Sequence, residues 1–151
     1  MWQAFWALFG AAATVAACYS AGALLVDWAR APLKRIERFP LSFVLGASVI
    51  HLAVFAILAL KIAYRPLVVA LLLIPIGWAV WKGSWRLKGD AVETLSLALK
   101  AFSAPIFAIF TVLYFFHAWA PESSPDGSAY HLGLVARYLR VHGFEQVVTN
   151  M

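Results

Sequence analysis

Four side chains capable of acid–base chemistry lie close together near the C-terminal end of the sequence: Glu122, Asp126, Tyr130 and His131. A carboxylate can act as a general base that removes the proton of an acceptor hydroxyl group, and a neighbouring tyrosine and histidine can orient the reacting groups. These residues directly follow an apolar run long enough to cross a membrane, so we expect them at a membrane surface. Asp126 is the first candidate for the base, and Glu122 is the second.

Two simpler interpretations of the acidic stretch stay open. Ser124, Pro125 and Asp126 are typical of a helix N-terminus, where Asp126 would only interact with the helix dipole. Glu122 would then be a solvated loop residue. Asp126 and His131 could instead bind a divalent metal ion together, but two ligands at irregular spacing match no zinc motif. The sequence therefore predicts no metal and no other cofactor.

An amphipathic helix is predicted to follow the acidic stretch, from about residue 125 to residue 142. Apolar residues repeat at the i, i+3, i+4 and i+7 positions of one helical face: Leu132, Val135, Ala136 and Leu139. Arg137 lies on the polar side, and Gly143 stands where a glycine commonly ends a helix. Such a helix is too polar to cross a bilayer, so we expect it to lie parallel to the membrane surface.

The composition is far more apolar than that of a soluble protein, with 64% hydrophobic and only 13% charged residues. A typical soluble domain is about half apolar and about one quarter charged, so the sequence predicts an integral membrane protein. The basic residues lie beside apolar runs, and the net charge of +5 therefore does not indicate a nucleic-acid partner. Cys18 is the only cysteine, which excludes an intrachain disulfide.

Four apolar runs divide residues 1–119 into candidate transmembrane helices: 2–26, 41–60, 62–81 and 101–119. Each is close to the roughly 20 residues that a helix needs to cross a bilayer. Residues 120–151 form a separate external part with the acidic loop and the amphipathic helix. The predicted fold class is therefore an all-α integral membrane protein, with four transmembrane helices followed by an external helix parallel to the membrane.

The distribution of positive charge predicts the orientation. Eight basic residues lie in the first and third connectors: Arg30, Lys34, Arg35, Arg38, Lys82, Arg86, Lys88 and Lys100. The opposite side has four: Lys61, Arg65, Arg137 and Arg140. Connectors rich in lysine and arginine stay in the cytoplasm. Both termini and the acidic loop are therefore predicted on the external, periplasmic side of the inner membrane.

Two features inside the spans concern helix packing. Small residues along the first span would let a second helix approach closely: Gly10, Ala11, Ala12, Ala13, Ala16, Ala17, Ser20 and Ala21. His51 lies near the middle of the second span, where an unpartnered polar side chain is costly. It is interpreted either as a neutral histidine hydrogen-bonded to a neighbouring helix or as a proton relay or haem ligand.

Residues 120–144 also resemble a known family. They are similar to the first large external loop of bacterial GT-C superfamily membrane glycosyltransferases, most of all to family 39-like proteins with a Pro-x-x-Asp-x-x-x-Tyr-His-Leu signature. Asp126 matches the aspartate of this signature, and Tyr130 and His131 match its Tyr-His pair. The resemblance implies transfer of a sugar from a polyprenyl-phosphate donor on the external face. It implies Asp126 as the base, and Tyr130 and His131 as residues that orient it or contact the donor phosphate. Arg137 is a further candidate for substrate contact.

The resemblance covers only about the last 30 residues, and the earlier spans match merely as hydrophobic segments. Because the superfamily has many more than four spans, we expect the chain to be the N-terminal portion of a longer hexosyltransferase and to be inactive alone. Its expected partners are membrane lipid, the donor, and further transmembrane helices or membrane subunits. The rival hypothesis is a non-catalytic four-helix accessory subunit of a larger membrane complex.

Overall fold

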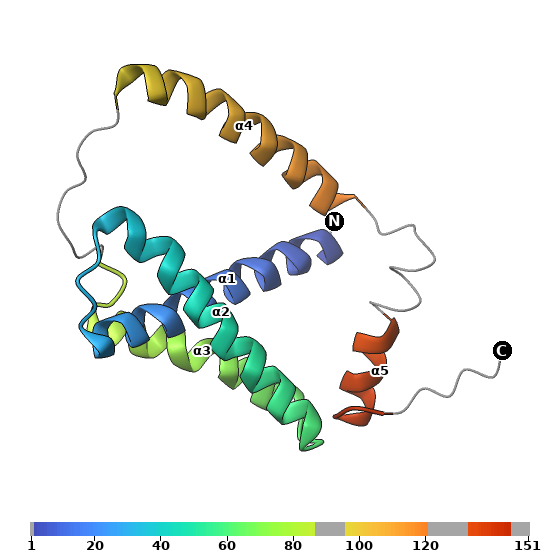
Figure 1. The fold of residues 1–151 in the computed structure, drawn as a ribbon. Helices are drawn as coiled ribbons and strands as arrows, with labels where there is room; N and C mark the ends of the chain where they lie inside the picture. Colours follow the sequence, from blue (N-terminus) through green and yellow to red (C-terminus); the bar gives the residue numbers. More distant parts are fainter. Residues whose placement is uncertain (1, 87–95, 121–132, 146–151) are drawn as a thin grey trace. The chain divides into compact units, whose positions relative to one another are not determined.

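A computed structural model describes residues 2–86, 96–120 and 133–145, and every regular element in these ranges is an α-helix (Figure 1). The chain divides into two compact units. The first, called here the three-helix unit, comprises Met1–Val92 together with Arg137–Met151, and the second comprises Glu93–Ala136. The predicted all-α fold is confirmed for the described residues.

Four helices are long and apolar enough to cross a membrane: α1 (Trp2–Ala29), α2 (Arg35–Ala59), α3 (Arg65–Lys82) and α4 (Leu97–Trp119). The shortest, α3, has 18 residues. At a rise of about 1.5 Å per residue it extends about 27 Å, close to the roughly 30 Å of a bilayer's hydrocarbon core. The number and the apolar character of the predicted helices are confirmed.

The helix ends differ from those predicted because capping side chains extend the helices into polar sequence. The Glu37 carboxylate accepts a hydrogen bond from the Lys34 backbone N–H at 3.0 Å, and α2 therefore begins at residue 35 instead of 41. The Ser96 hydroxyl accepts one from the Leu99 N–H at 3.3 Å, and α4 begins at residue 97 instead of 101. In contrast, α3 begins at residue 65, three residues after the predicted 62, with a proline in its first turn.

Helices α1 and α2 cross where each has a glycine. A Cβ atom placed on Gly22 would lie 1.7 Å from the Ser42 carbonyl oxygen, and one on Gly46 would lie 1.6 Å from the Cys18 carbonyl oxygen. Small residues four apart on both helices thus bring the two backbones into direct contact. The first span does approach another helix closely, as predicted, but the contact centres on Cys18 and Gly22, which were not among the predicted small residues. Gly10, which was also predicted to take part, has nothing within 4 Å of such a Cβ.

Polar contacts bind α1 to its neighbours at one end of this unit. Arg38 Nη2 lies 2.7 Å from Asp27 Oδ1, and the two side chains are only 5% and 25% exposed. The buried Ser20 hydroxyl accepts a hydrogen bond from Trp85 Nε1 at 3.0 Å and donates one to the Ala16 carbonyl at 2.6 Å. These contacts join α1 both to α2 and to the segment that follows α3.

Helix α3 packs on α1 less closely than α2 does. Ala79 is the only buried residue of α3. It continues as an α-helix through Pro75 and ends at Gly83, whose φ of 67° is in the left-handed region. Helix α4 belongs to the second unit, and its side chains are mostly exposed and apolar on all sides.

A fifth helix, α5 (Gly133–Val141), confirms helix over the described part of the predicted segment, whose residues 125–132 lie outside the described ranges. The predicted cap at Gly143 is displaced by one residue. His142 takes the left-handed position, with a φ of 61°, and the Gly143 N–H donates to the Tyr138 carbonyl at 3.0 Å.

Candidate functional site

The four residues that the sequence singles out first, Glu122, Asp126, Tyr130 and His131, lie outside the described residues. Their proposed roles as base and as donor-contacting residues stay predictions. The site is therefore built from the described chain on either side of this loop, which ends at Ala120 and resumes in α5.

Arg137, the predicted substrate-binding cation, lies on α5 and forms an ion pair within its own segment. Its Nε donates to Glu145 Oε2 at 2.7 Å, and both side chains are more than 40% exposed. The hydrogen bond from Arg137, together with its charge, lowers the pKa of the Glu145 carboxyl, and the same hydrogen bond raises the pKa of Arg137. An exposed pair of this kind contributes little to stability. A substrate phosphate would have to compete with Glu145 for this guanidinium.

The residues after α5 form what we call the C-terminal clasp, residues 142–144, on the turn between α2 and α3. The Ala63 N–H donates to the His142 carbonyl at 3.0 Å, and the Phe144 N–H donates to the Leu58 carbonyl at 3.1 Å. The His142 ring lies 4.2 Å from the ring of Tyr64, measured between centroids. Two backbone hydrogen bonds and a ring contact therefore fix this segment to the turn.

Gly143 makes the C-terminal clasp possible. A Cβ atom there would lie 2.7 Å from the Leu58 carbonyl oxygen and 2.7 Å from Lys61 Cγ, closer than real Cβ atoms come to other atoms. On either side of it, His142 and Phe144 contribute rings, and the Phe144 ring lies 5.4 Å from that of Phe55. Sequence reasoning assigned Gly143 only to a helix cap. The signal that it missed was a glycine between two aromatic residues.

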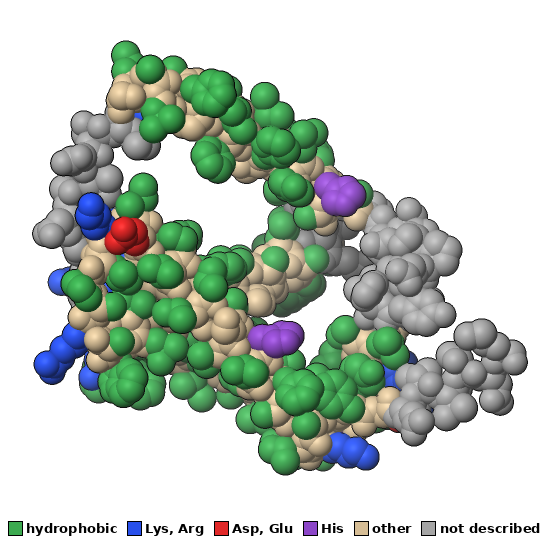
Figure 2. All heavy atoms as spheres, in the orientation of Figure 1, with side chains coloured by type: hydrophobic (Ala, Val, Ile, Leu, Met, Phe, Trp, Pro, Cys, Tyr) green, Lys and Arg blue, Asp and Glu red, His purple; other side chains and the backbone are tan. Residues whose placement is uncertain are grey.

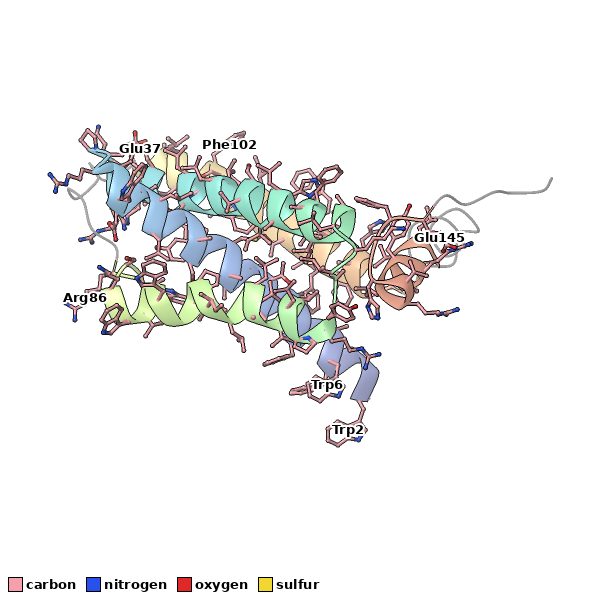
Figure 3. The ribbon with its side chains drawn as sticks, turned by 90° about the horizontal axis from the view of Figure 1, so that it is seen from below. Trp2, Trp6, Glu37, Arg86, Phe102 and Glu145 are labelled. Atoms are coloured by element: carbon pink, nitrogen blue, oxygen red, sulfur yellow. The ribbon has the colours of Figure 1, made fainter. Side chains whose placement is uncertain are left out.

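The three-helix unit has two chemically different ends. Figure 3 shows Glu37 and Arg86 at one end, and Trp2, Trp6 and Glu145 toward the other. Six described cations belong to the first end: Arg30, Lys34, Arg35, Arg38, Lys82 and Arg86. Apolar side chains cover the helices between the ends, and blue side chains gather where α1 leads into α2 (Figure 2). The C-terminal clasp and the basic residues thus lie at opposite ends.

An open groove of about 780 Å³ runs between α1 and α3. Its walls are mainly apolar: Ala21, Leu24, Leu25, Trp28, Val49, Ile50, Ala70, Leu71, Ile74, Pro75 and Trp78. Polar groups occur in its lining only at the basic end, where Asp27, Lys82 and Ser84 lie. This groove was not predicted from the sequence, because it depends on how closely α1 and α3 pack.

Two further expectations concern metals and His51. Within the described ranges, no group of three or more histidine, cysteine, aspartate or glutamate residues is placed to hold a metal ion. His51 is exposed on α2, so neither α1 nor α3 covers it. Its role as a relay, as a haem ligand or as a partner of another helix stays a prediction.

No protein-family model, curated protein or solved structure matches this chain. The resemblance to GT-C glycosyltransferases therefore depends on residues 120–144 alone.

Proposed function

We propose that this chain is the membrane-embedded N-terminal portion of a GT-C-like glycosyltransferase of the inner membrane. It would transfer a sugar from a polyprenyl-phosphate donor to an acceptor on the external face. The four apolar helices would be transmembrane, and the loop with Asp126 would lie outside the cytoplasm.

The position of the C-terminal clasp supports the membrane arrangement in this proposal. The first described part of the three-helix unit ends at Arg86, at the basic end, and the chain belongs to this unit again from Arg137 on, beside the α2–α3 turn at the opposite end. In the described part of the chain between these points lies one apolar helix, α4, whose 23 residues are long enough for a single crossing. A chain that leaves one end of the unit and returns at the other must cross the membrane an odd number of times. This supports four spans, with the Asp126 loop opposite the cytoplasmic basic connectors.

The chemistry follows from the resemblance. Asp126 would remove the proton of the acceptor hydroxyl as the sugar leaves the donor phosphate, while Tyr130 and His131 orient the acceptor or contact that phosphate. Helix α5 would lie along the membrane surface. Its exposed Val135 and Leu139 support this, because lipid would cover an apolar face that the protein leaves uncovered.

The catalytic test compares Asp126→Asn with Glu122→Gln in the natural protein, reconstituted in liposomes with a radiolabelled polyprenyl-phosphate hexose. Loss of a general base lowers the rate by about 10²–10⁴-fold. Asparagine caps a helix nearly as well as aspartate, so folding should be retained. We expect nearly complete loss of transfer in Asp126→Asn and a smaller loss in Glu122→Gln. A normally folded Asp126→Asn protein with wild-type turnover would leave Asp126 as a helix cap only.

The topology test uses single cysteines at Pro32 and at Ala120, both exposed and uncharged. The parent protein is the blank, because its one cysteine, Cys18, is buried. An impermeant thiol reagent added to intact spheroplasts should label the Ala120→Cys protein and leave the Pro32→Cys protein unlabelled until the cells are lysed. Labelling of both from outside would contradict the four-span arrangement.

A non-catalytic accessory subunit is the second candidate function. The exposed apolar side chains on all four long helices favour it, because helices of partner subunits can cover such surfaces. This candidate predicts a larger native complex in mild detergent and full activity of that complex after Asp126→Asn substitution. The glycosyltransferase proposal predicts the opposite result for the same variant.

A further inference from the structure

The groove between α1 and α3 combines an apolar body with one polar mouth. Helices α1, α2 and α3 all contribute apolar lining along its length, and its volume of about 780 Å³ is within the range of ligand pockets, about 300–1,000 Å³. Trp28 and Trp78 line it as well and are largely exposed. Tryptophan is enriched at the headgroup level of membranes, where its ring contacts acyl chains and polar groups together.

The mouth of the groove has the charge that an anion requires. Lys82, in the last turn of α3, lines the groove, and Arg86 lies in the segment just beyond it. Asp27 also lines the mouth, but its carboxylate is bonded to the Arg38 guanidinium at 2.7 Å, which compensates its negative charge. Six cations and two carboxylates, Asp27 and Glu37, belong to this end of the three-helix unit in the described chain. The end is therefore strongly electropositive.

We propose that the groove binds one anionic phospholipid of the cytoplasmic leaflet, with an acyl chain between α1 and α3 and the headgroup phosphate at Lys82. The charge complementarity at the mouth favours this occupant over a purely apolar one, such as a helix. Basic pockets between transmembrane helices on the cytoplasmic side bind anionic headgroups in this manner. The lipid site lies at the end opposite the C-terminal clasp and does not depend on the proposed sugar transfer.

The test is lipid binding by native mass spectrometry of the purified, delipidated protein, titrated with phosphatidylglycerol and, separately, with phosphatidylcholine of the same acyl chains. We expect the first phosphatidylglycerol molecule to bind more tightly than the first phosphatidylcholine. Lys82→Gln should weaken phosphatidylglycerol binding about fivefold, as expected for one lysine at a headgroup, and should remove most of the preference. Ala70→Phe, which inserts a ring into the groove lining, should abolish binding of the first molecule of either lipid.

Two controls keep the result specific. Lys61→Gln removes a cation at the opposite end and should leave lipid binding unchanged. Thermal unfolding in detergent should show that Lys82→Gln and Ala70→Phe proteins are folded. The proposal is overturned if the two lipids bind equally, or if Lys82→Gln changes nothing. It also fails if Ala70→Phe leaves binding intact, or if the mass spectra show a second copy of the chain that this substitution releases.

Discussion

Helix α1 packs against α2 and α3 in two different ways. Against α2 the backbones themselves touch, at Gly22 and Gly46, and no side chain separates them. Against α3 the two helices leave a groove lined by large side chains, with Ala79 as the only buried residue of α3. The difference shows that glycine, and not hydrophobicity, decides which contacts are close here. If these helices lie in a membrane as proposed, removal of water does not drive either contact, because the lipid tails are themselves apolar.

The largest effect is therefore expected at the glycine crossing. Gly22→Val or Gly46→Val would place side-chain atoms within the backbone of the other helix, which cannot move aside as a flexible side chain can. We expect destabilisation of at least about 4 kcal/mol, the range of exceptional single substitutions, measured by thermal unfolding in detergent.

The matched controls are Gly10→Ala and Gly77→Ala, because a Cβ at either position meets nothing within 4 Å. In a helix interior each should stabilise the protein by about 0.5–1 kcal/mol. Equal destabilisation at Gly10 and at Gly22 would show that the crossing is not where the structure has it.

The second effect in size concerns the ion pair that supports the same crossing. Arg38→Met removes one partner of Asp27, whose side chain is three quarters buried. We expect a loss of about 3 kcal/mol, at the lower end of the values for broken buried pairs, because Asp27 keeps some exposure to solvent. Adding Asp27→Asn to this variant should restore part of the stability. If the loss of unfolding free energy in the double variant equals the sum of the losses in the two single variants, the two side chains do not interact.

The smallest effect is expected in the turn that brings α2 back onto α1. Arg30 has a φ of 51°, a conformation that glycine adopts without strain. Arg30→Gly should therefore raise the unfolding free energy by a few tenths of a kcal/mol, because the relief of strain is offset in part by the loss of a cation at the end of α1. Arg30→Val should lower it, because a β-branched side chain tolerates a positive φ less well than arginine does. Thermal unfolding in detergent measures the stability of the Arg30→Gly and Arg30→Val proteins. An Arg30→Val protein more stable than the parent would contradict the left-handed backbone conformation of residue 30.

The number of long helices could be predicted from the sequence, because an apolar run of sufficient length is a local property. The point at which α1 and α2 cross could not be predicted, since small residues occur along the whole first span. Only the contact with Ser42 and Gly46 on α2 shows that α1 crosses at Cys18 and Gly22. The spacing of Cys18 and Gly22 on one helix and of Ser42 and Gly46 on the other was the available signal. The groove and the C-terminal clasp were missed because both depend on residues distant in sequence. The roles of Asp126 and its neighbours remain predictions.

The C-terminal clasp has a consequence for the order in which the chain matures. Leu58 and Ala63 are synthesised about 80 residues before their partners His142 and Phe144, so the turn between α2 and α3 stays open while the rest is made. If the four long helices cross a membrane as proposed, the two hydrogen bonds can form only after the segment that follows α4 has reached the side on which this turn lies. Under the proposed topology, protection of the Ala63 amide from hydrogen exchange would mark completed insertion, and a chain in which α4 failed to cross would leave that amide exchanging freely.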